Sequence, residues 1–382
     1  MTKVALIKCS SYNFEEVKMA IGKGIELIGG IRNFISTDEN ILLKPNILTG
    51  ANPERCITTH PQIFRAISEI LLEKRFSISY GDRPGIVPPL IAAKKSGLAE
   101  IADLLKIPFA DFNTTYTHHF NEGKFIKSFD FYKAIADHRA FISLPKFKTH
   151  TFTKITGAVK NQFGCLTFIP RREYHAHMNN PVLFSKMILD LNQAIHPRLY
   201  IVDAIEAMEG DGPVGGNPVK LNLIAISSDP VALDATLCRV INLDPSIVPS
   251  VYYGSLYGYG FLNEDDIEIV GNSLKEFVNP GFRVDRSQVS EPEKKGILNP
   301  IFRRISRKPK VIAGNCTHCA NCVDACPVMP KAIYFPEKDS EKAPVIDYSL
   351  CIRCYCCFEM CSYNAIYLSN PFIRKVLNAL PV

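Results

Sequence analysis

The sequence predicts an α/β protein with a mainly parallel sheet covered by helices on both faces, followed by a small cysteine-rich α+β domain. Short apolar segments alternate with amphipathic segments over residues 1–280, and this alternation favours strands and helices that build a parallel sheet. Nine of the 13 cysteines lie within 46 residues after residue 310. We therefore expect an α/β domain over 1–280, a basic linker over 281–310 and the cysteine-rich domain over 311–382.

Length and composition are consistent with this organisation. The chain has 382 residues, of which 47% are hydrophobic and 21% charged, which is enough for two or three domains and excludes a disordered chain. Its apolar runs are shorter than the ~20 residues of a membrane helix, and Glu15 and Glu16 interrupt the region where a signal peptide would be apolar. We therefore expect a cytoplasmic protein whose cysteines are not paired in disulfides.

The predicted strands are six short apolar segments, and the predicted helices are three longer amphipathic ones. The strands cover 4–7, 41–43, 77–80, 140–144, 199–202 and 221–226. The helices cover 61–72, 181–195 and 230–241. Asn180 and Asp229 are suitable N-caps, and each is followed by proline at the first helical position.

Polar residues follow four of the predicted strands. In parallel sheets, ligands bind in the crevice outside the carboxyl ends of the strands, so these residues are predicted to converge on one cleft. They are Lys44 and Asn46 after the second strand, Asp82 after the third, Lys146, Lys148 and His150 after the fourth, and Asp203 after the fifth.

Two lysines of this group indicate an anionic ligand. In an extended chain Lys146 and Lys148 face the same side, and two like charges on one side favour a bound anion. His150 and Asp203 are candidate proton donors. Structural alternatives remain open: Lys44 as a solvated loop residue, His150 as a hydrogen-bonded core residue, and Asp203 as a cap.

Two segments resemble functional motifs but lack the required context. Residues 210–216 match G-x-G-x-x-G, yet Pro213 interrupts the pattern and a strand follows, whereas a dinucleotide loop must open a helix. We interpret this segment as a loop that closely approaches a ligand or another backbone. Residues 171–177 contain histidines two positions apart and are predicted to form a cationic lid or a surface loop.

The clustered cysteines form a repeated pattern. It reads C-x2-C-x2-C-x3-C-P over residues 316–327 and C-x2-C-x2-C-x3-C over residues 351–361. Three thiolates on one tight loop can reach three irons of one [4Fe–4S] cluster, and the fourth reaches the other cluster. We therefore predict two [4Fe–4S] clusters, one held by Cys316, Cys319, Cys322 and Cys361, the other by Cys351, Cys354, Cys357 and Cys326.

Further features of this region favour iron–sulfur clusters over zinc. A zinc site takes four thiolates, not two interleaved sets. The sequence Ala-Ile-Tyr follows each run, at 332–334 and 365–367, which indicates a duplicated unit. Residues 313–367 resemble the two-cluster bacterial ferredoxins, which implies a small ferredoxin-like domain, although Ser362 stands where proline is expected. Cys356 fits neither set and is interpreted as a bystander near a cluster.

Several short motifs of the α/β part are similar to those of one family. They are L-P-K-F-K-T-H at 144–150, G-A-V-K-N-Q-F-G at 157–164, E-G-D-G-P at 209–213 and D-P-V-A-L-D at 229–234. With them the chain resembles the family named domain of unknown function 362 over about residues 3–272. The resemblance names no substrate, and it implies anaerobic biology, an iron–sulfur context and a site with Lys146, Lys148, His150, Lys160 and Asn161.

The net charge of +6 lies in the connector. Residues 283–310 hold nine Lys and Arg against three Asp and Glu, and the rest of the chain is balanced. The connector is interpreted as a tether along the large domain, as a docking site for an acidic redox partner, or as an amphipathic segment at 297–310 that contacts anionic lipid. Nucleic-acid binding is not expected, because the flanking domains carry no net positive charge.

Together these features predict an iron–sulfur oxidoreductase. Two [4Fe–4S] clusters would relay low-potential electrons between a redox partner protein and an anionic small molecule, a substrate or cofactor, in the α/β domain. Lys44, Lys146 and Lys148 would hold the anion, and His150 or Asp203 would supply a proton. Two alternatives are a non-catalytic electron-transfer subunit that docks a partner enzyme and a redox-sensing ligand-binding or maturation protein.

Overall fold

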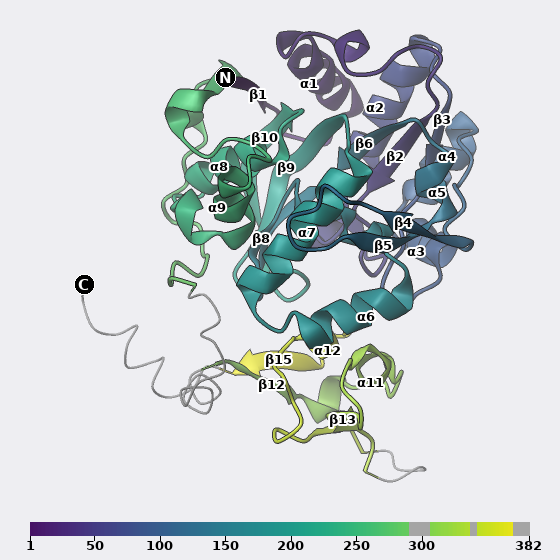
Figure 1. Ribbon diagram of the computed structural model, residues 1–382, viewed down its shortest axis with the longest axis vertical. Helices are drawn as coiled ribbons and strands as arrows, with labels where there is room; N and C mark the ends of the chain where they lie inside the picture. The colour runs from purple at the N-terminus through teal and green to yellow at the C-terminus, as the bar shows by residue number, and fades with distance from the viewer. Residues whose placement is uncertain (290–305, 337–341, 370–382) are drawn as a thin grey trace.

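A computed structural model describes residues 1–289, 306–336 and 342–369, without the side chains of residues 168–170 and 172. Figure 1 shows a large α/β part with the C-terminal part packed at one end of it. The predicted fold class is confirmed: a mostly parallel sheet lies between two layers of helices, and a small α+β part follows.

Nine strands form one mixed sheet. They are β1 (Thr2–Lys8), β2 (Ile41–Pro45), β3 (Ile78–Tyr80), β6 (Ala140–Leu144), β7 (Lys146–His150), β8 (Lys154–Thr156), β9 (Leu199–Glu209), β10 (Asn217–Ser227) and β11 (Ile267–Gly271). Seven lie in the order β11-β1-β10-β9-β6-β2-β3, and β7 pairs with both β9 and β8. Strands β9, β6, β2 and β3 are parallel neighbours, whereas β10 runs antiparallel to β1 and β9.

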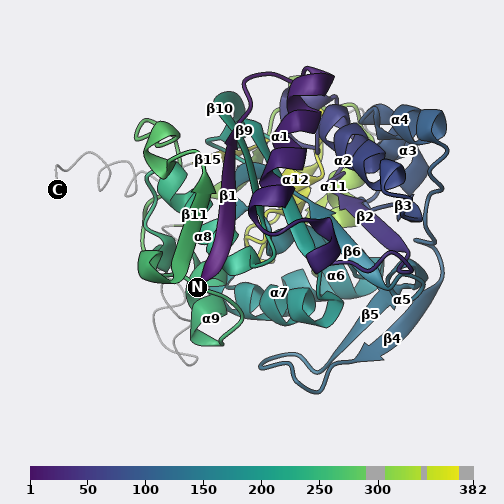
Figure 2. The same ribbon diagram turned by 90° about the horizontal axis from the view of Figure 1, so that it is seen from above.

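Helices cover both faces of this sheet (Figure 2). One face carries α1 (Phe14–Leu27), α2 (Pro61–Glu73), α3 (Pro89–Lys95) and α4 (Leu98–Leu105), and the other carries α7 (Pro181–Ile195), α8 (Pro230–Val240) and α9 (Pro249–Leu256). Successive side chains of a strand alternate between the two cores: in β1, Val4 and Leu6 pack toward α7–α9, whereas Ala5 packs toward α1–α4. The remaining elements of this part are α5 (Lys133–Ala136), α6 (Phe168–His177) and the hairpin of β4 (Thr115–His119) and β5 (Ser128–Tyr132).

The three predicted helices are confirmed to within one residue at their ends. Helix α7 spans the predicted range, α2 ends one residue later and α8 one residue earlier. Asn180 accepts a hydrogen bond from the Val182 N–H at the start of α7, and Asp229 caps α8 in the same way. The local N-cap pattern therefore determines where these helices begin.

Two predictions about local structure are wrong. Strand β9 runs through Glu209 and β10 begins at Asn217, so the residues after 202 are strand and not loop, because the two strands pair along their length. Residues 171–177 are not a lid or surface loop but belong to α6, where Arg171 and His175 are buried.

The glycine-rich segment at 210–216 connects β9 to β10. A side chain at Gly212 would overlap the carbonyl oxygen of Thr149 in β7. The predicted close approach to another backbone is therefore confirmed, and the approach requires the absence of a side chain at this position.

The C-terminal part consists of two similar halves. Its elements are β12 (Lys308–Val311), α11 (Asn321–Ala325), β13 (Ile333–Tyr334), β14 (Val345–Ile346), α12 (Cys356–Glu359) and β15 (Ile366–Ser369). Strand β12 pairs with β15 and β14 with β13, so each half contributes a strand to the other. The repeated Ala-Ile-Tyr sequences lead into β13 and β15, as a duplicated unit requires. Residues 308–310, which the sequence assigns to the connector, belong to β12.

The connector follows the large domain as far as it is described. Arg283 forms an ion pair of 2.7 Å with Glu209, and Arg286 donates hydrogen bonds to the carbonyl oxygens of Ile241 and Asn242. Residues 290–305, and with them most of the predicted lipid-contacting segment, lie outside the described residues. In the described ranges no helix has the length and apolar character to cross a membrane.

Candidate functional site

The eight predicted cluster ligands surround two separate hollows in the C-terminal part. One hollow is lined by Cys316, Cys319, Cys322 and Cys361, and the other by Cys326, Cys351, Cys354 and Cys357. Each run of cysteines thus gives its fourth member to the other hollow, which is the arrangement that two interleaved [4Fe–4S] clusters need. The ninth cysteine, Cys356, lines neither hollow.

The backbone of the two cysteine loops also fits such a cluster. His318 and Ala320 have φ values of 56° and 61°, and Arg353 and Tyr355, at the equivalent positions of the second loop, have values of 61° and 64°. Left-handed residues in short loops can turn backbone N–H groups into a concave anion site, as in many iron–sulfur proteins. A [4Fe–4S] cluster in each hollow would supply one-electron transfer at low potential.

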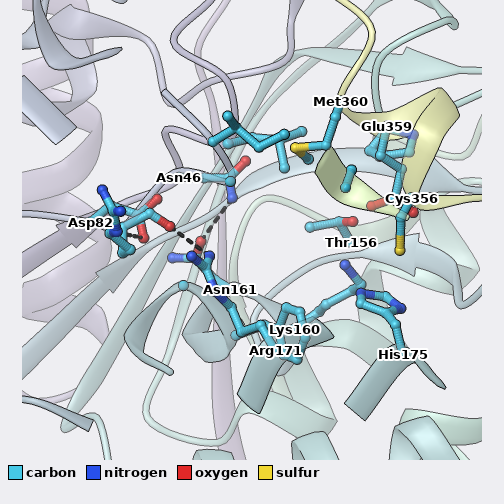
Figure 3. Close-up of a pocket in the computed structure, with 18 of the residues that line it drawn as sticks. Asn46, Asp82, Thr156, Lys160, Asn161, Arg171, His175, Cys356, Glu359 and Met360 are labelled. Atoms are coloured by element: carbon cyan, nitrogen blue, oxygen red, sulfur yellow. Dashed lines mark hydrogen bonds between the residues drawn. The ribbon is translucent and has the colours of Figure 1, made fainter. Parts of the chain in front are cut away.

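A pocket lies between the carboxyl ends of the strands and α12 (Figure 3). Its space is about 860 Å³, part of it open to solvent. Cys356 and Glu359 of α12 line it, and Cys357 of the same short helix lines the neighbouring hollow. The other polar side chains of its wall are Lys44, Asn46, Asp82, Arg83, Lys148, Thr156, Lys160, Asn161, Arg171 and His175.

Five of the predicted site residues form one hydrogen-bonded network in this pocket, which we call the frame: Lys44, Asn46, Asp82, Lys148 and Asn161. The Nζ atom of Lys44 lies 2.9 Å from Oδ1 of Asp82 and donates to Oδ1 of Asn161. Asn46 donates to the same Asn161 oxygen and accepts a bond of 2.7 Å from Lys148. All five are buried, and four of them, Lys44, Asn46, Asp82 and Lys148, come from the segments that the sequence analysis placed after strands.

Positive groups outnumber negative groups around the pocket. The cations are Lys44, Lys148, Lys160, Arg83 and Arg171, and the anions are Asp82 and Glu359. Burial, and next the charge of Lys160, holds the pKa of Lys148 well below its ordinary value, and burial lowers the pKa of Lys160 itself. Lys44, Lys148 and Arg171 are buried, and buried cations are costly without a compensating charge, so the pocket is suited to an anion.

Lys146 and Asp203 lie in a different group, which we call the closed cluster: Lys146, Asp203, Tyr12 and His60. The Nζ atom of Lys146 lies 2.9 Å from Asp203 and 2.7 Å from the Tyr12 hydroxyl, which donates to the other Asp203 oxygen. Tyr12 stacks on His60 at 3.5 Å. The pairing of β7 with β9 shifts register between Lys146 and Lys148, so their side chains reach different partners.

His150 is buried and contacts the C-terminal part. Its Nδ1 atom accepts hydrogen bonds from the N–H groups of Phe152 and Thr153, so the proton of the neutral ring is on Nε2. Nε2 lies 3.3 Å from Oε1 of Glu359. Burial, and next the charge of Lys160, holds the pKa of His150 well below its ordinary value, so the ring is neutral.

The sequence analysis missed five polar residues of the pocket wall: Arg83, Thr156, Arg171, His175 and Glu359. Arg171 donates to the carbonyl oxygens of Arg83 and Pro84. A helical interpretation of 171–177 would have placed Arg171 and His175, four residues apart, on one face. The residues around Glu359 in the sequence do not predict that it lines the pocket, because it reaches the pocket only through the packing of the C-terminal part against the strand ends.

Comparisons with known proteins match both parts of the chain. The model of a family described as "Domain of unknown function (DUF362)" matches residues 41–239, and that of a "4Fe-4S dicluster domain" matches residues 294–365. The chain is similar to the "Thylakoid-associated protein sll1697" of Synechocystis sp., with 31% identity over 253 residues, which is 65% of this chain and 77% of that protein.

A solved structure from Thermotoga maritima resembles the chain weakly. Its TM-score is 0.37 at 11% sequence identity, and the match covers 59% of this chain and 57% of that one.

Proposed function

This chain belongs to the family described as domain of unknown function 362, and we propose that it is an oxidoreductase that transfers electrons to an anionic small molecule bound in the pocket. The dicluster match identifies it more broadly as an iron–sulfur electron-transfer protein. One observation carries the proposal: the wall of the pocket combines cations from the strand ends with α12, the helix that also contributes Cys357 to a cluster hollow.

The packing of the C-terminal part supports electron transfer into the pocket. Arg55 of the α/β part donates to the Ser362 carbonyl and the Asn364 side chain, next to Cys361. Arg307 forms a bidentate pair with Asp211. These contacts hold the C-terminal part, and with it α12, against the α/β part beside the pocket.

Reduction of an organic group takes up protons as well as electrons. His150 contacts Glu359, a pocket residue, with its Nε2–H side. Asp203 is enclosed by Lys146, Tyr12 and the His60 N–H, outside the pocket wall. Asp203 therefore becomes a residue of the scaffold, and His150, a neutral ring outside the pocket wall, positions the Glu359 carboxyl group and does not itself donate a proton.

The pocket favours this function over that of a non-catalytic carrier. A carrier needs an exposed cluster face for its partner, but it does not need a cationic pocket beside the cluster. A two-cluster electron carrier alone would leave this excess of buried positive charge unexplained.

The experiment begins with strictly anaerobic purification. We expect about eight irons and eight sulfides per chain, and mass spectrometry of the denatured protein is expected to show a released organic anion. That anion, added to the chemically reduced protein, should reoxidise the clusters in a stopped-flow measurement. Full cluster content without any reoxidation by the released molecules would contradict the oxidoreductase and favour the carrier.

A further inference from the structure

The polar groups of the pocket differ in whether the protein itself satisfies them. In the frame, Lys44, Asp82 and Asn161 bond to one another. Across the pocket, Oγ1 of Thr156 and Nδ1 of His175 have no hydrogen-bond partner among the described residues, although the two residues are only 3% and 8% exposed. Native proteins leave few buried polar atoms unpaired, so such a group indicates a missing partner.

A charged group accompanies these atoms. Lys160, at the start of the short 3₁₀ helix Lys160–Cys165, makes neither a hydrogen bond nor an ion pair within the described part of the chain, and its Nζ lies 5.9 Å from the Phe163 ring centre. Figure 3 shows Thr156, Lys160 and His175 grouped on one side of the pocket, with the sulfur of Cys356 directed toward them. They come from β8, the 3₁₀ helix and α6, so three separate segments converge on one place.

We propose that Thr156, Lys160 and His175 form the subsite that binds the oxyanion group, a carboxylate or a phosphate, of the pocket ligand. This inference rests on the proposed function, because it specifies which end of the pocket holds the anion. The frame, in contrast, positions the backbone of the strand ends and does not bind the anion directly.

The chemistry of the three side chains suits an oxyanion. Lys160 supplies a positive charge and up to three N–H donors, and Thr156 supplies a hydroxyl donor. His175 stacks on Phe184 at 4.8 Å and meets Phe163 edge-on, so its ring is fixed. Burial, and next the charge of Lys160, lowers the pKa of His175 to about 3, so the ring is a neutral donor through one nitrogen.

The charges around this subsite are balanced by the binding of one anion. Lys148 lies close enough to Lys160 for the two charges to repel, and Glu359 supplies the opposing negative charge. Ile86, Phe163 and Met360 provide an apolar surface beside the polar groups. The ligand class is therefore an organic molecule with one oxyanion group and an apolar body.

The test is isothermal titration of the anaerobically purified, cluster-loaded full chain with benzoate and, separately, with inorganic phosphate. We expect saturable binding of one probe at millimolar concentration or below: benzoate if the ligand is a carboxylate, phosphate if it is a phosphate ester. Lys160→Met should weaken that binding by about tenfold or more, and Thr156→Val by about threefold to tenfold. The control Lys275→Met, an exposed lysine beside the edge strand β11, should bind as the original chain does.

Two outcomes would overturn the subsite. One is that neither probe binds the original chain, and the other is that both variants, with full cluster content and an unchanged melting temperature, bind as tightly as the original. Cluster reoxidation separates this inference from the proposed function. Binding that depends on Lys160 without any reoxidation would keep the subsite and remove the oxidoreductase, whereas reoxidation unaffected by Lys160→Met would do the reverse.

Discussion

Two groups of polar side chains, the closed cluster and the pocket wall, lie near one another in the α/β part, and they differ in how far the protein neutralises them. In the closed cluster, Lys146, Asp203 and Tyr12 satisfy one another, and none of the three lines the pocket. In the pocket, Lys160 and Thr156 face open space without partners in the described chain. Position after a strand therefore identifies buried polar residues, but their hydrogen-bond partners distinguish scaffold from ligand site.

The largest expected effect is on iron content, and it compares two neighbouring cysteines of α12 that face different sites. Cys357 lines a cluster hollow, whereas Cys356 faces the pocket. Cys357→Ala should lose one cluster, so iron content should fall from about eight to about four per chain. Cys356→Ala is the matched control and should retain all the iron. Equal iron in both variants would show that the two thiols are assigned to the wrong roles.

The next effect tests the closed cluster. Asp203→Ala leaves Lys146 buried and without its carboxylate, so the free energy of unfolding should fall by about 3–5 kcal/mol. Asp211→Ala, which breaks the more exposed pair with Arg307, should cost about 1 kcal/mol or less. Denaturation under anaerobic conditions measures both. A similar small loss for both variants would mean that the closed cluster contributes little to stability.

The pH dependence of stability tests the burial of His175. Its pKa is about 3 in the folded protein against 6.5 as the ordinary value, so the unfolded chain binds a proton first as the pH falls. The stabilising contribution is complete above pH 6.5 and decreases by about 1.4 kcal/mol per pH unit below it. His175→Phe, which keeps an aromatic ring beside Phe184, should lose less stability than the original chain between about pH 7 and about pH 5.5. Parallel curves for the two proteins would contradict a buried neutral ring.

The smallest expected effect is that of Lys160→Met on the free energy of unfolding. Lys160→Met removes a partly buried charge that has no hydrogen bond or ion pair in the described chain, so the free energy of unfolding should stay unchanged or rise by up to about 1 kcal/mol. This outcome is opposite in sign to that of Asp203→Ala. A large loss of stability in Lys160→Met would place Lys160 in the scaffold, together with Lys146.

The sequence predicts the parts of the site that depend on local pattern. The cysteine spacing predicts which four residues line each hollow, the strand ends predict that Lys44 and Asp82 meet, and the family resemblance adds Asn161. Long-range structure determines the rest. A register shift separates Lys146 from Lys148, and Glu359 lines the pocket because a second domain packs there. Neither the register shift nor this packing can be predicted from the residues nearby in the sequence.

Electron paramagnetic resonance of the reduced protein tests the central claim most directly. A benzoate or phosphate anion bound by Thr156, Lys160 and His175 would lie beside Cys356, next to a cluster ligand. We predict that the probe that binds changes the spectrum of one cluster in the original chain and leaves the spectrum of Lys160→Met unchanged. An identical spectrum with and without a bound probe, or an equal change in Lys160→Met, would contradict an anion site beside the clusters.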